Sequence, residues 1–471
     1  MCDSSNAGLR RWTSLGVVAL TLGGCVDDAT EPNPGTRPTL VAAAVVPNPL
    51  NTLSAAVDIT ARGAEAAMVR FWRAGGAVHT SPAYPFEADS VVRVPVLGLD
   101  TAATYAIEIV LAGEDTAVAA DTVAFTSGSL PAWIPAAVPL GTDTTAGFLA
   151  LSYPDGPVII DNTGRVVWYL HAPDPTLVSF QAHGNGRYTL LTPADPGRRF
   201  HVLDELGAEV RTLECVGYLT RFHDVLMLED GSAWILCDET VTMDLTPYGG
   251  QSNAQVTWTV VQHLAADGTT VLFEWHAADH FDISDVPPSE LGGSAVNATH
   301  GNGVALDVDG HLLLSFRALN EITKVDATTG AVLWRFGGER NEFTLVNDAK
   351  GSFERQHGVQ RAGPGVIQFL DNGSAGPSRL VRYQINRVTR TALLVMDFRD
   401  GLTVTPVGGS TQYYTTGYGL VSFGRAGRVI EVDPVGNPVW QLTGIDGLYV
   451  FRAQRVNSLY PPALGQPVPA R

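Results

Sequence analysis

A turn motif that recurs along the last two-thirds of the chain constrains the fold most strongly. Each copy is an aspartate followed within four residues by a glycine and then by apolar residues, often ending in tryptophan. Copies begin at Asp161, Asp204, Asp267, Asp326 and Asp433, and a degenerate copy covers residues 385–388. Because glycine readily adopts the positive φ angle of a tight turn, each copy is predicted to join two antiparallel strands.

The spacing of the copies indicates the architecture. Successive copies lie between 43 residues (Asp161 to Asp204) and 63 residues (Asp204 to Asp267) apart, a length that holds one four-stranded blade of a β-propeller. Six copies therefore predict an all-β fold with a six-bladed β-propeller over residues 131–465, and five or seven blades stay open as alternatives. The segment 448–460 is predicted to return to the first blade and close the ring. The 49 glycines and 29 prolines agree with many short strands.

A second, smaller all-β unit is predicted ahead of the propeller. Tyr105, Ile107, Ile109 and Leu111 alternate with other residues, as in a half-buried strand. The surrounding run LGLDTAATYAIEIV resembles the tyrosine-corner strand of fibronectin type III-like sandwiches. The run SGSLP at 127–131 marks a boundary, so residues 38–130 are predicted to form an immunoglobulin-like β-sandwich that serves as a spacer or scaffold.

The N-terminus resembles an export signal. Arg10 and Arg11 precede a short apolar stretch, and Leu22-Gly23-Gly24-Cys25 resembles the bacterial lipoprotein signal. Residues 1–24 are predicted to be the signal peptide, Cys25 the lipidated residue and residues 25–37 a polar, proline-rich tether. The protein is then exported and anchored by lipid to the cell envelope, with the choice between inner and outer membrane left open. Simple secretion is the main alternative.

Charge and cysteine content exclude some classes of partner. The net charge of −18 without a long basic run argues against nucleic-acid binding. After Cys25 only Cys215 and Cys237 follow. They could pair in an oxidising compartment, which the sequence leaves open, and without neighbouring ligands they do not predict a metal site. No cofactor is predicted, and the oligomeric state stays open, a homodimer included.

Three histidines suggest where the chemistry lies. His223, His300 and His357 each stand at the head of a predicted strand in three different repeats. If these strands line the propeller axis, the three imidazoles and Arg317 meet in one pocket. Imidazoles and a guanidinium suit a substrate with an anionic group.

The order of these motifs resembles the bacterial arylsulfate sulfotransferases over roughly residues 130–465. The similarity comprises four segments, which are His223-Asp-Val-Leu, His300-Gly-Asn302 with Ser315-Phe-Arg317, Trp334-Arg-Phe-Gly-Gly338, and Gln356-His357 with Phe369-Leu-Asp-Asn-Gly373. The resemblance implies a six-bladed propeller that moves a sulfuryl group from a phenolic sulfate ester to a phenolic acceptor. It also implies a sulfohistidine intermediate and no need for 3′-phosphoadenylyl sulfate (PAPS).

The resemblance also implies roles for individual residues. His357 matches the nucleophile, His300 and Arg317 match the His-x-Asn and Ser-x-Arg elements, and His223 matches an earlier site histidine. Asn302 falls where the family has an asparagine near the sulfate. The residue types fit this chemistry, since a neutral imidazole is a nucleophile near pH 7 and arginine can hold the sulfuryl oxygens.

Other histidines and other functions are weaker candidates. His183 is predicted to be structural or to lie at the channel rim, and His276 and His280 are predicted to pack a loop rather than bind metal. The compact stretch between His300 and His357 leaves the substrates open. Two alternatives to a sulfotransferase are a non-enzymatic propeller lipoprotein that acts as a binding scaffold and an aryl sulfatase-like hydrolase that uses water as acceptor.

Overall fold

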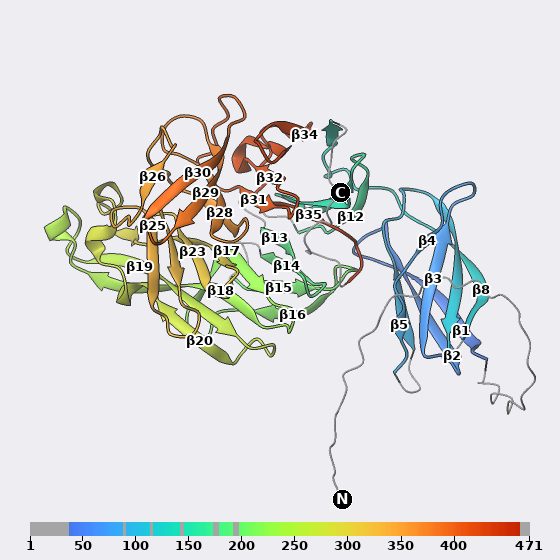
Figure 1. Cartoon of the computed structure of the whole chain (residues 1–471). Coiled ribbons are helices and arrows are strands. Elements are labelled where there is room, and N and C mark those ends of the chain that lie inside the picture. Colours follow the sequence, from blue (N-terminus) through green and yellow to red (C-terminus); the bar gives the residue numbers. More distant parts are fainter. Residues whose placement is uncertain are drawn as a thin grey trace, which may run out of the picture.

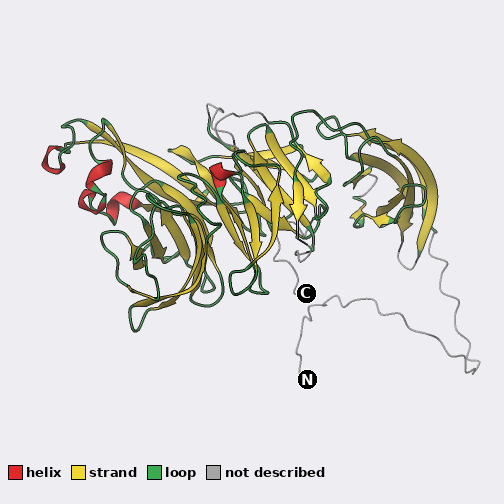
Figure 2. Cartoon of the chain, turned by 90° about the horizontal axis from the view of Figure 1, so that it is seen from above, coloured by secondary structure: helices red, strands yellow, loops and turns green. Residues whose placement is uncertain are grey.

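A computed structural model describes residues 37–87, 91–113, 116–141, 146–172, 179–191 and 197–461. These residues are nearly all β, as predicted, and contain no α-helix, only short 3-10 turns (Figure 2). The predicted signal peptide, Cys25 and all of the predicted tether except residue 37 lie outside the described residues. Within those residues, no helix has the length and apolar character needed to cross a membrane.

The first eight strands form two sheets of their own, drawn in blue and cyan in Figure 1. One sheet has the order β1 (Thr39–Pro47), β2 (Ala55–Arg62), β6 (Val92–Val96). The other has the order β4 (His79–Thr80), β3 (Ala66–Trp72), β7 (Thr104–Ala112), β8 (Ala117–Thr126), and β5 (Tyr84–Pro85) also pairs with β3.

These two sheets share one apolar core, and Tyr105 forms the kind of hydrogen bond expected of a tyrosine corner. Inward residues of both sheets, among them Val57, Val94 and Ile107, belong to a single buried cluster. The hydroxyl of Tyr105 accepts a hydrogen bond of 2.9 Å from the backbone N–H of Asp100. This bond runs back to the residues just upstream, as in a tyrosine corner.

The rest of the chain builds six further sheets in sequence order. The first sheet consists of β35 (Ala453–Val456), β10 (Phe148–Tyr153), β11 (Gly156–Asp161) and β12 (Val166–Tyr169), and the second of β13 (Ser179–Ala182), β14 (Tyr188–Leu191), β15 (Phe200–Leu203) and β16 (Glu209–Leu213). The third consists of β17 (Leu219–Met227), β18 (Ala233–Met243), β19 (Ala254–Leu264) and β20 (Val271–His276), with β21 (Ala295–Asn297) paired to β19, and the fourth of β22 (Gly301–Leu306), β23 (Leu312–Phe316), β24 (Glu321–Val325) and β25 (Val332–Gly337). The fifth consists of β27 (His357–Arg361), β28 (Val366–Asp371), β29 (Arg379–Asn386), β30 (Thr391–Phe398) and β26 (Thr344–Val346), and the sixth of β31 (Ser410–Tyr413), β32 (Gly419–Ser422), β33 (Val429–Val432), β34 (Pro438–Thr443) and β9 (Val138–Leu140).

The turn motif has the same place in all six sheets. Each copy forms the turn between the third and the fourth strand, from β11–β12 at Asp161 to β33–β34 at Asp433. In the second sheet the side chain of Asp204 accepts hydrogen bonds of 2.9 Å from the backbone N–H groups of Leu206 and Ala208, and Gly207 supplies a φ of +86°. The repeat in the sequence therefore corresponds to one sheet per copy.

The first strands of the six sheets meet around a common centre. β13 contacts β17, β17 contacts β22, β22 contacts β27, β27 contacts β31, and β31 contacts β35, which in turn contacts β13. β35 comes from the C-terminal end and pairs with β10, so that Val456 lies opposite Phe148. The return of the last segment to the first sheet is thus as predicted, and the arrangement is propeller-like (Figure 1).

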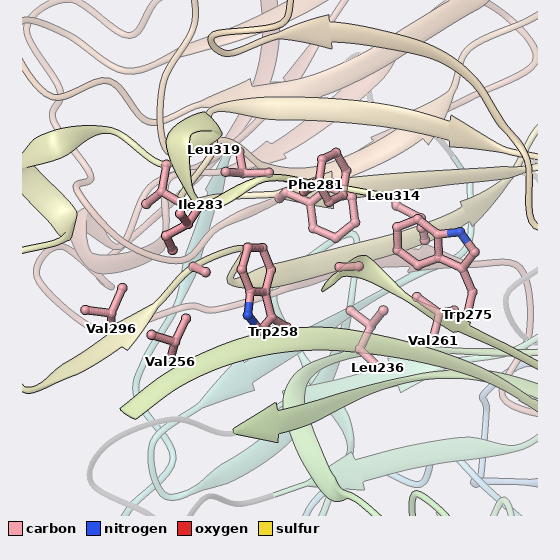
Figure 3. Packing of buried hydrophobic residues seen from close by; sticks show 14 of the residues in the cluster. Leu236, Val256, Trp258, Val261, Trp275, Phe281, Ile283, Val296, Leu314 and Leu319 are labelled. Atoms are coloured by element: carbon pink, nitrogen blue, oxygen red, sulfur yellow. The ribbon is translucent and has the colours of Figure 1, made fainter. Parts of the chain in front are cut away.

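Apolar clusters fill the spaces between neighbouring sheets. In the cluster shown in Figure 3, Trp258 and Trp275 from the third sheet pack with Leu314 from the fourth and with Phe281 from the connecting loop. Trp275 ends its turn motif, and its indole N–H donates a 3.0 Å hydrogen bond to the carbonyl of Gly330 in the next motif. Trp168 donates likewise to the carbonyl of Glu205 at 3.0 Å. At these two positions the tryptophan of the motif links one sheet by a hydrogen bond to the turn of the next sheet.

A disulfide and several polar contacts join separate parts of the fold. Cys215, which follows β16, is bonded to Cys237 on β18, so the pairing that the sequence left open links the second sheet to the third. The N-terminal sheets contact the propeller-like part through the hydroxyl of Tyr169, which accepts from the backbone N–H of Thr52 at 3.0 Å. The hydroxyl of Tyr460 accepts from that of Leu97 at 3.1 Å.

Candidate active site

Three of the six innermost strands are irregular at or next to the histidines. In β17, residues 221–224 lie between the pairs Thr220–Cys237 and Val225–Ile235. β22 has an extra residue between Gly301 and Gly303, and β27 has one between His357 and Gln360. The other three innermost pairings, β13–β14, β31–β32 and β10–β35, keep a regular register. A bulge changes the direction of the side chains around it, and all three histidines lie at or beside such an irregularity.

His223 and His300 form a contacting pair of rings. Their Nε2 atoms are 3.0 Å apart and their centroids 5.0 Å apart. The backbone N–H of His300 donates to Asn297 Oδ1 at 3.0 Å, which leaves the Asn297 amide nitrogen to face His300 Nδ1 at 3.3 Å. His300 Nδ1 is then the acceptor, so its proton resides on Nε2 and points at His223. His300 also has a φ of +50°, an uncommon value for a residue with a side chain.

His357 is held through Nδ1 by a buried amide. Its Nδ1–H donates to Asn372 Oδ1 at 2.8 Å and to the carbonyl of Arg355 at 3.0 Å. The Asn372 amide nitrogen donates to the carbonyls of Thr405 and Gly408 at 2.7 and 2.9 Å, so this amide cannot flip. With the proton fixed on Nδ1, Nε2 of neutral His357 carries the lone pair. The ring centroid of His357 is 6.0 Å from that of His223.

Glycine allows the strand of His357 to approach its neighbour. Gly358 has a φ of +63°, and a Cβ there would come within 2.7 Å of the backbone nitrogen of Thr411 on β31. The hydroxyl of Thr411 donates to the carbonyl of Gly358 at 2.8 Å. A side chain at this position would therefore displace β27 and the histidine before it.

Arg317 and Asn302 lie beside the histidines. The backbone N–H of Arg317 donates to the carbonyl of His300 at 3.0 Å, and its partly buried guanidinium forms no ion pair with a carboxylate in the described part of the chain. The Asn302 amide nitrogen donates to the carbonyl of Gln356 at 2.7 Å, while its buried Oδ1 has no hydrogen-bond partner among the described residues. Asn302 thus contacts the backbone directly before His357.

Burial and positive charge keep the three imidazoles neutral. Burial lowers the pKa of His223 and of His300 well below the usual value, and Arg221 and Arg317 lower it further. Burial also lowers the pKa of His357 to about 4, although the hydrogen bond to Asn372 opposes that shift. At neutral pH all three rings are therefore uncharged, and the positive charge comes from the arginines.

Aromatic residues and paired arginines surround this cluster. The rings of Phe222 and Phe451 have centroids 4.4 and 6.1 Å from that of His223. Arg452 forms an ion pair of 2.9 Å with Asp224, and Arg221 pairs with Asp238. The region therefore combines apolar surface with cations, which suits an aromatic ring that carries an anionic group.

The three other histidines considered in the sequence take no part in this cluster. His183 is buried and its Nε2 bonds the hydroxyl of Thr189 at 2.8 Å within the β13–β14 hairpin. His276 lies between Glu239 and Glu274, and His280 stacks on Trp275 with centroids 4.8 Å apart. Across the described ranges, no group of three or more His, Cys, Asp or Glu side chains could hold a metal ion.

One surface cavity lies away from the histidine cluster. A cavity of about 910 Å³ is lined by residues of β30, β33 and β34, among them Phe398, Ile430 and Trp440. None of the predicted site residues lines it. We therefore base the candidate site on the histidine cluster, where the chemical groups converge.

Sequence reasoning did not assign a role to Asn372 or Asn297. Asn372 stands in the Asp-Asn-Gly run of the resemblance, two residues beyond the strand partner of His357, but its contact is made across the sheet and not along the chain. Asn297 lies three residues before His300, and only the left-handed backbone of His300 brings its amide onto the ring. The Asp-Asn-Gly run was the one signal that could have pointed to Asn372.

Comparison with solved structures finds several proteins of low sequence identity. A protein of unknown function from Bacteroides caccae is 13% identical with a TM-score of 0.42, and the match covers 64% of this chain and 97% of that one. A putative 6-phosphogluconolactonase from Bacteroides uniformis is 11% identical with a TM-score of 0.38, covering 83% and 99%. Virginiamycin B lyase from Staphylococcus aureus is 12% identical with a TM-score of 0.34, covering 74% and 93%.

The sequence comparisons identify the family. No curated protein matches this chain. The family model described as arylsulfotransferase (ASST) matches residues 201–445, which is more than half of the chain and includes the three clustered histidines, Arg317 and Asn372. The chain belongs to the arylsulfotransferase (ASST) family.

Proposed function

We propose that this protein moves a sulfuryl group from an aryl sulfate to a phenol, independently of PAPS, through a sulfohistidine at His357. The observation that carries the proposal is the fixed tautomer of His357, whose Nδ1–H is held by Asn372 at 2.8 Å so that Nε2 is free to attack. Its pKa of about 4 keeps that nitrogen unprotonated at neutral pH.

In the first half-reaction the Nε2 lone pair of His357 attacks sulfur. The N–S bond forms as the S–O bond to the aryl group breaks, and charge on the sulfuryl oxygens is held by Arg317. The bound sulfate is an anion beside His223 and His300, so it raises the pKa of the pair, which takes up one proton from solvent. That proton passes to the leaving phenolate, and the phenol departs.

The second half-reaction reverses these steps. The acceptor phenol gives its proton to the now neutral His223–His300 pair while its oxygen attacks the sulfur of sulfo-His357. The N–S bond breaks, and the electron pair returns to Nε2. Asn372 keeps the proton of Nδ1 in place throughout, so the imidazole leaves in its starting tautomer.

A transfer assay tests this function against its alternatives. Incubation with 4-nitrophenyl sulfate and phenol should release 4-nitrophenol and phenyl sulfate in equal amounts. Release of inorganic sulfate without phenyl sulfate would instead identify a hydrolase. A protein that turns over no aryl sulfate, with or without an acceptor, would act as a binding scaffold.

The hydrogen bond from His357 to Asn372 predicts a pH effect. In Asn372→Asp a carboxylate faces Nδ1–H and should raise the pKa of His357 by about 1 to 3 units from about 4. Because only the neutral ring attacks, the acidic limb of the kcat/KM profile should move toward neutral pH, with activity recovered under alkaline conditions. The measurement is kcat/KM for 4-nitrophenyl sulfate as a function of pH.

Two further variants show whether Asn372 acts on the ring. Asn372→Leu should lower activity across the pH range and move the limb to lower pH, the opposite direction, because it removes a hydrogen bond that raises the pKa of His357 and adds no charge. Asn386→Asp makes the same substitution at the exposed β29–β30 turn and should keep the wild-type profile. An unshifted limb in an active Asn372→Asp enzyme would contradict the role of Asn372.

The architecture and the location form part of the proposal. The six sheets with contacting first strands support a six-bladed propeller over residues 131–465, and the shared core of the first two sheets supports an immunoglobulin-like sandwich over residues 38–130. The signal pattern in residues 1–25 supports export and a lipid anchor at Cys25.

Removal of the cysteine tests the anchor. Cys25→Ser should abolish acylation, because the thiol accepts the lipid, and should move the protein from the membrane fraction to the soluble fraction. Fractionation followed by detection of the protein measures this. Cys2→Ser, which lies outside the lipoprotein pattern, is the matched control and should stay with the membrane. An unchanged membrane fraction for Cys25→Ser would contradict the anchor.

A further inference from the structure

Two arginines near the candidate site differ from their neighbours because, in the described part of the chain, their guanidiniums form no ion pair with a carboxylate. Arg221 and Arg452 pair with Asp238 and Asp224. Arg317 and Arg425 form no ion pair with any carboxylate in the described ranges, in a protein of net charge −18. Unpaired cations beside a site for anionic substrates are available to bind a ligand.

Arg425 is placed over an aromatic ring at the same end of the strands as the histidines. It lies in the 3-10 turn Gly424–Ala426 between β32 and β33, and its guanidinium carbon is 5.4 Å from the ring centroid of Tyr449. The backbone N–H of Val450 donates to the carbonyl of Gly424 at 3.0 Å, which fixes this turn beside Tyr449. The side chain of Arg425 is exposed and therefore accessible to a substrate.

Tyr449 connects Arg425 to the reacting groups. Its hydroxyl lies over Gly408, where a Cβ would overlap it, and the carbonyl of Gly408 accepts from Asn372. On the other side, its ring centroid is 6.3 Å from that of Phe451, which packs against His223. Tyr449 thus lies between the histidine cluster and Arg425.

Charges around Tyr449 are mostly positive. Burial raises the pKa of Tyr449 to about 12, while Arg425 and Arg317 act in the opposite direction, so its hydroxyl stays protonated at neutral pH and can donate a hydrogen bond. Burial lowers the pKa of Arg317, and Glu290, a carboxylate that opposes this, is itself 3.5 Å from Arg355. The charge of both arginines is therefore available to an anionic ligand.

We propose that Arg425 and Tyr449 form a subsite for a second anionic group on the aromatic substrate, a carboxylate on the ring that carries the sulfate or the acceptor hydroxyl. This inference rests on the proposed sulfuryl transfer. The sulfuryl group lies at His357 and Arg317, the ring extends along Tyr449, and the carboxylate receives the forked N–H groups of Arg425. The preferred substrates are then aryl sulfates and phenols with an anionic substituent.

The test compares two donors that differ in charge. Wild-type kcat/KM should be higher for 4-sulfooxybenzoate than for 4-nitrophenyl sulfate after correction for leaving-group pKa. Arg425→Gln should lower kcat/KM for 4-sulfooxybenzoate about tenfold, as for loss of a charge-assisted hydrogen bond at an exposed site, and leave 4-nitrophenyl sulfate within about twofold. Arg425→Lys, which keeps the charge, should retain part of the preference.

A control and a binding measurement separate the subsite from the reaction. Arg387→Gln removes the same charge at an exposed position in the β29–β30 turn and should change neither donor. Calorimetry without turnover should show 4-hydroxybenzoate binding about tenfold more tightly than phenol, with the difference lost in Arg425→Gln. Equal effects of Arg425→Gln on both donors, or equal binding of both phenols, would overturn the subsite while leaving sulfuryl transfer intact. Absence of turnover with selective binding would overturn the transfer alone.

Discussion

His357→Asn should abolish both the burst and steady-state turnover with an aryl sulfate. The variant has no imidazole nitrogen to form the N–S bond, and loss of a nucleophile lowers kcat by more than about 10⁴-fold in comparable enzymes. Wild-type protein incubated with 4-nitrophenyl sulfate and no acceptor should release one 4-nitrophenol per site. It should then carry an acid-labile sulfuryl group on the peptide that contains His357, which mass spectrometry of a digest at neutral or alkaline pH detects.

Two variants distinguish this result from a general loss of structure. His311→Asn replaces a partly exposed histidine directly before β23 and should keep the full burst. His357→Gly leaves space at the end of β27, and added imidazole should restore part of the turnover by accepting the sulfuryl group in place of the side chain. Full activity in His357→Asn, or a sulfuryl group on another residue, would remove His357 from the role of nucleophile.

The repeat in the sequence predicted the arrangement of sheets because the turn is a local structure. An aspartate side chain and a glycine with positive φ define the turn within a few residues, as at Asp204 and Gly207, and the spacing counts the sheets. What the motif tryptophan does could not be predicted, because the partners of Trp168 and Trp275 lie 37 and 55 residues further along. The same holds for Cys215 and Cys237, whose pairing depends on how two neighbouring sheets pack.

The candidate site was predictable by residue type but not by geometry. Histidines at the heads of successive strands indicated that His223, His300 and His357 could meet, and His223 indeed contacts both of the others. The irregular register at residues 221–224 breaks the alternation of a strand, so an extrapolated pattern cannot tell which way His223 points. The support from Asn372 depends on the loop at Thr405 and Gly408, which comes more than thirty residues later.

Arg317→Ala should slow sulfuryl transfer by about 10²–10³-fold while leaving the nucleophile in place, as for the loss of one strong charge-stabilising donor. Arg317 has no carboxylate partner within the described residues, and its charge acts on all three histidines of the cluster. Its guanidinium is therefore free to hold the oxygens of the sulfuryl group, where charge is spread in a loose transition state. Single-turnover release of 4-nitrophenol measures the effect on the first half-reaction.

The kinetic parameter that falls in Arg317→Ala shows what Arg317 does. Because the stabilisation is needed mainly in the transition state, kcat and kcat/KM should fall together, with a smaller change in the affinity for the ester. Arg317→Lys keeps a charge but loses the fork of N–H groups, so it should recover only part of the rate. Arg361→Ala, at the opposite and exposed end of β27, removes the same side chain and should leave the rate unchanged. If Arg317→Ala lost affinity for the ester but kept kcat, the guanidinium would bind the donor without stabilising the transferring group. Another of the surrounding cations would then have to stabilise the charge on the sulfuryl oxygens, and Arg452 would be the first to test.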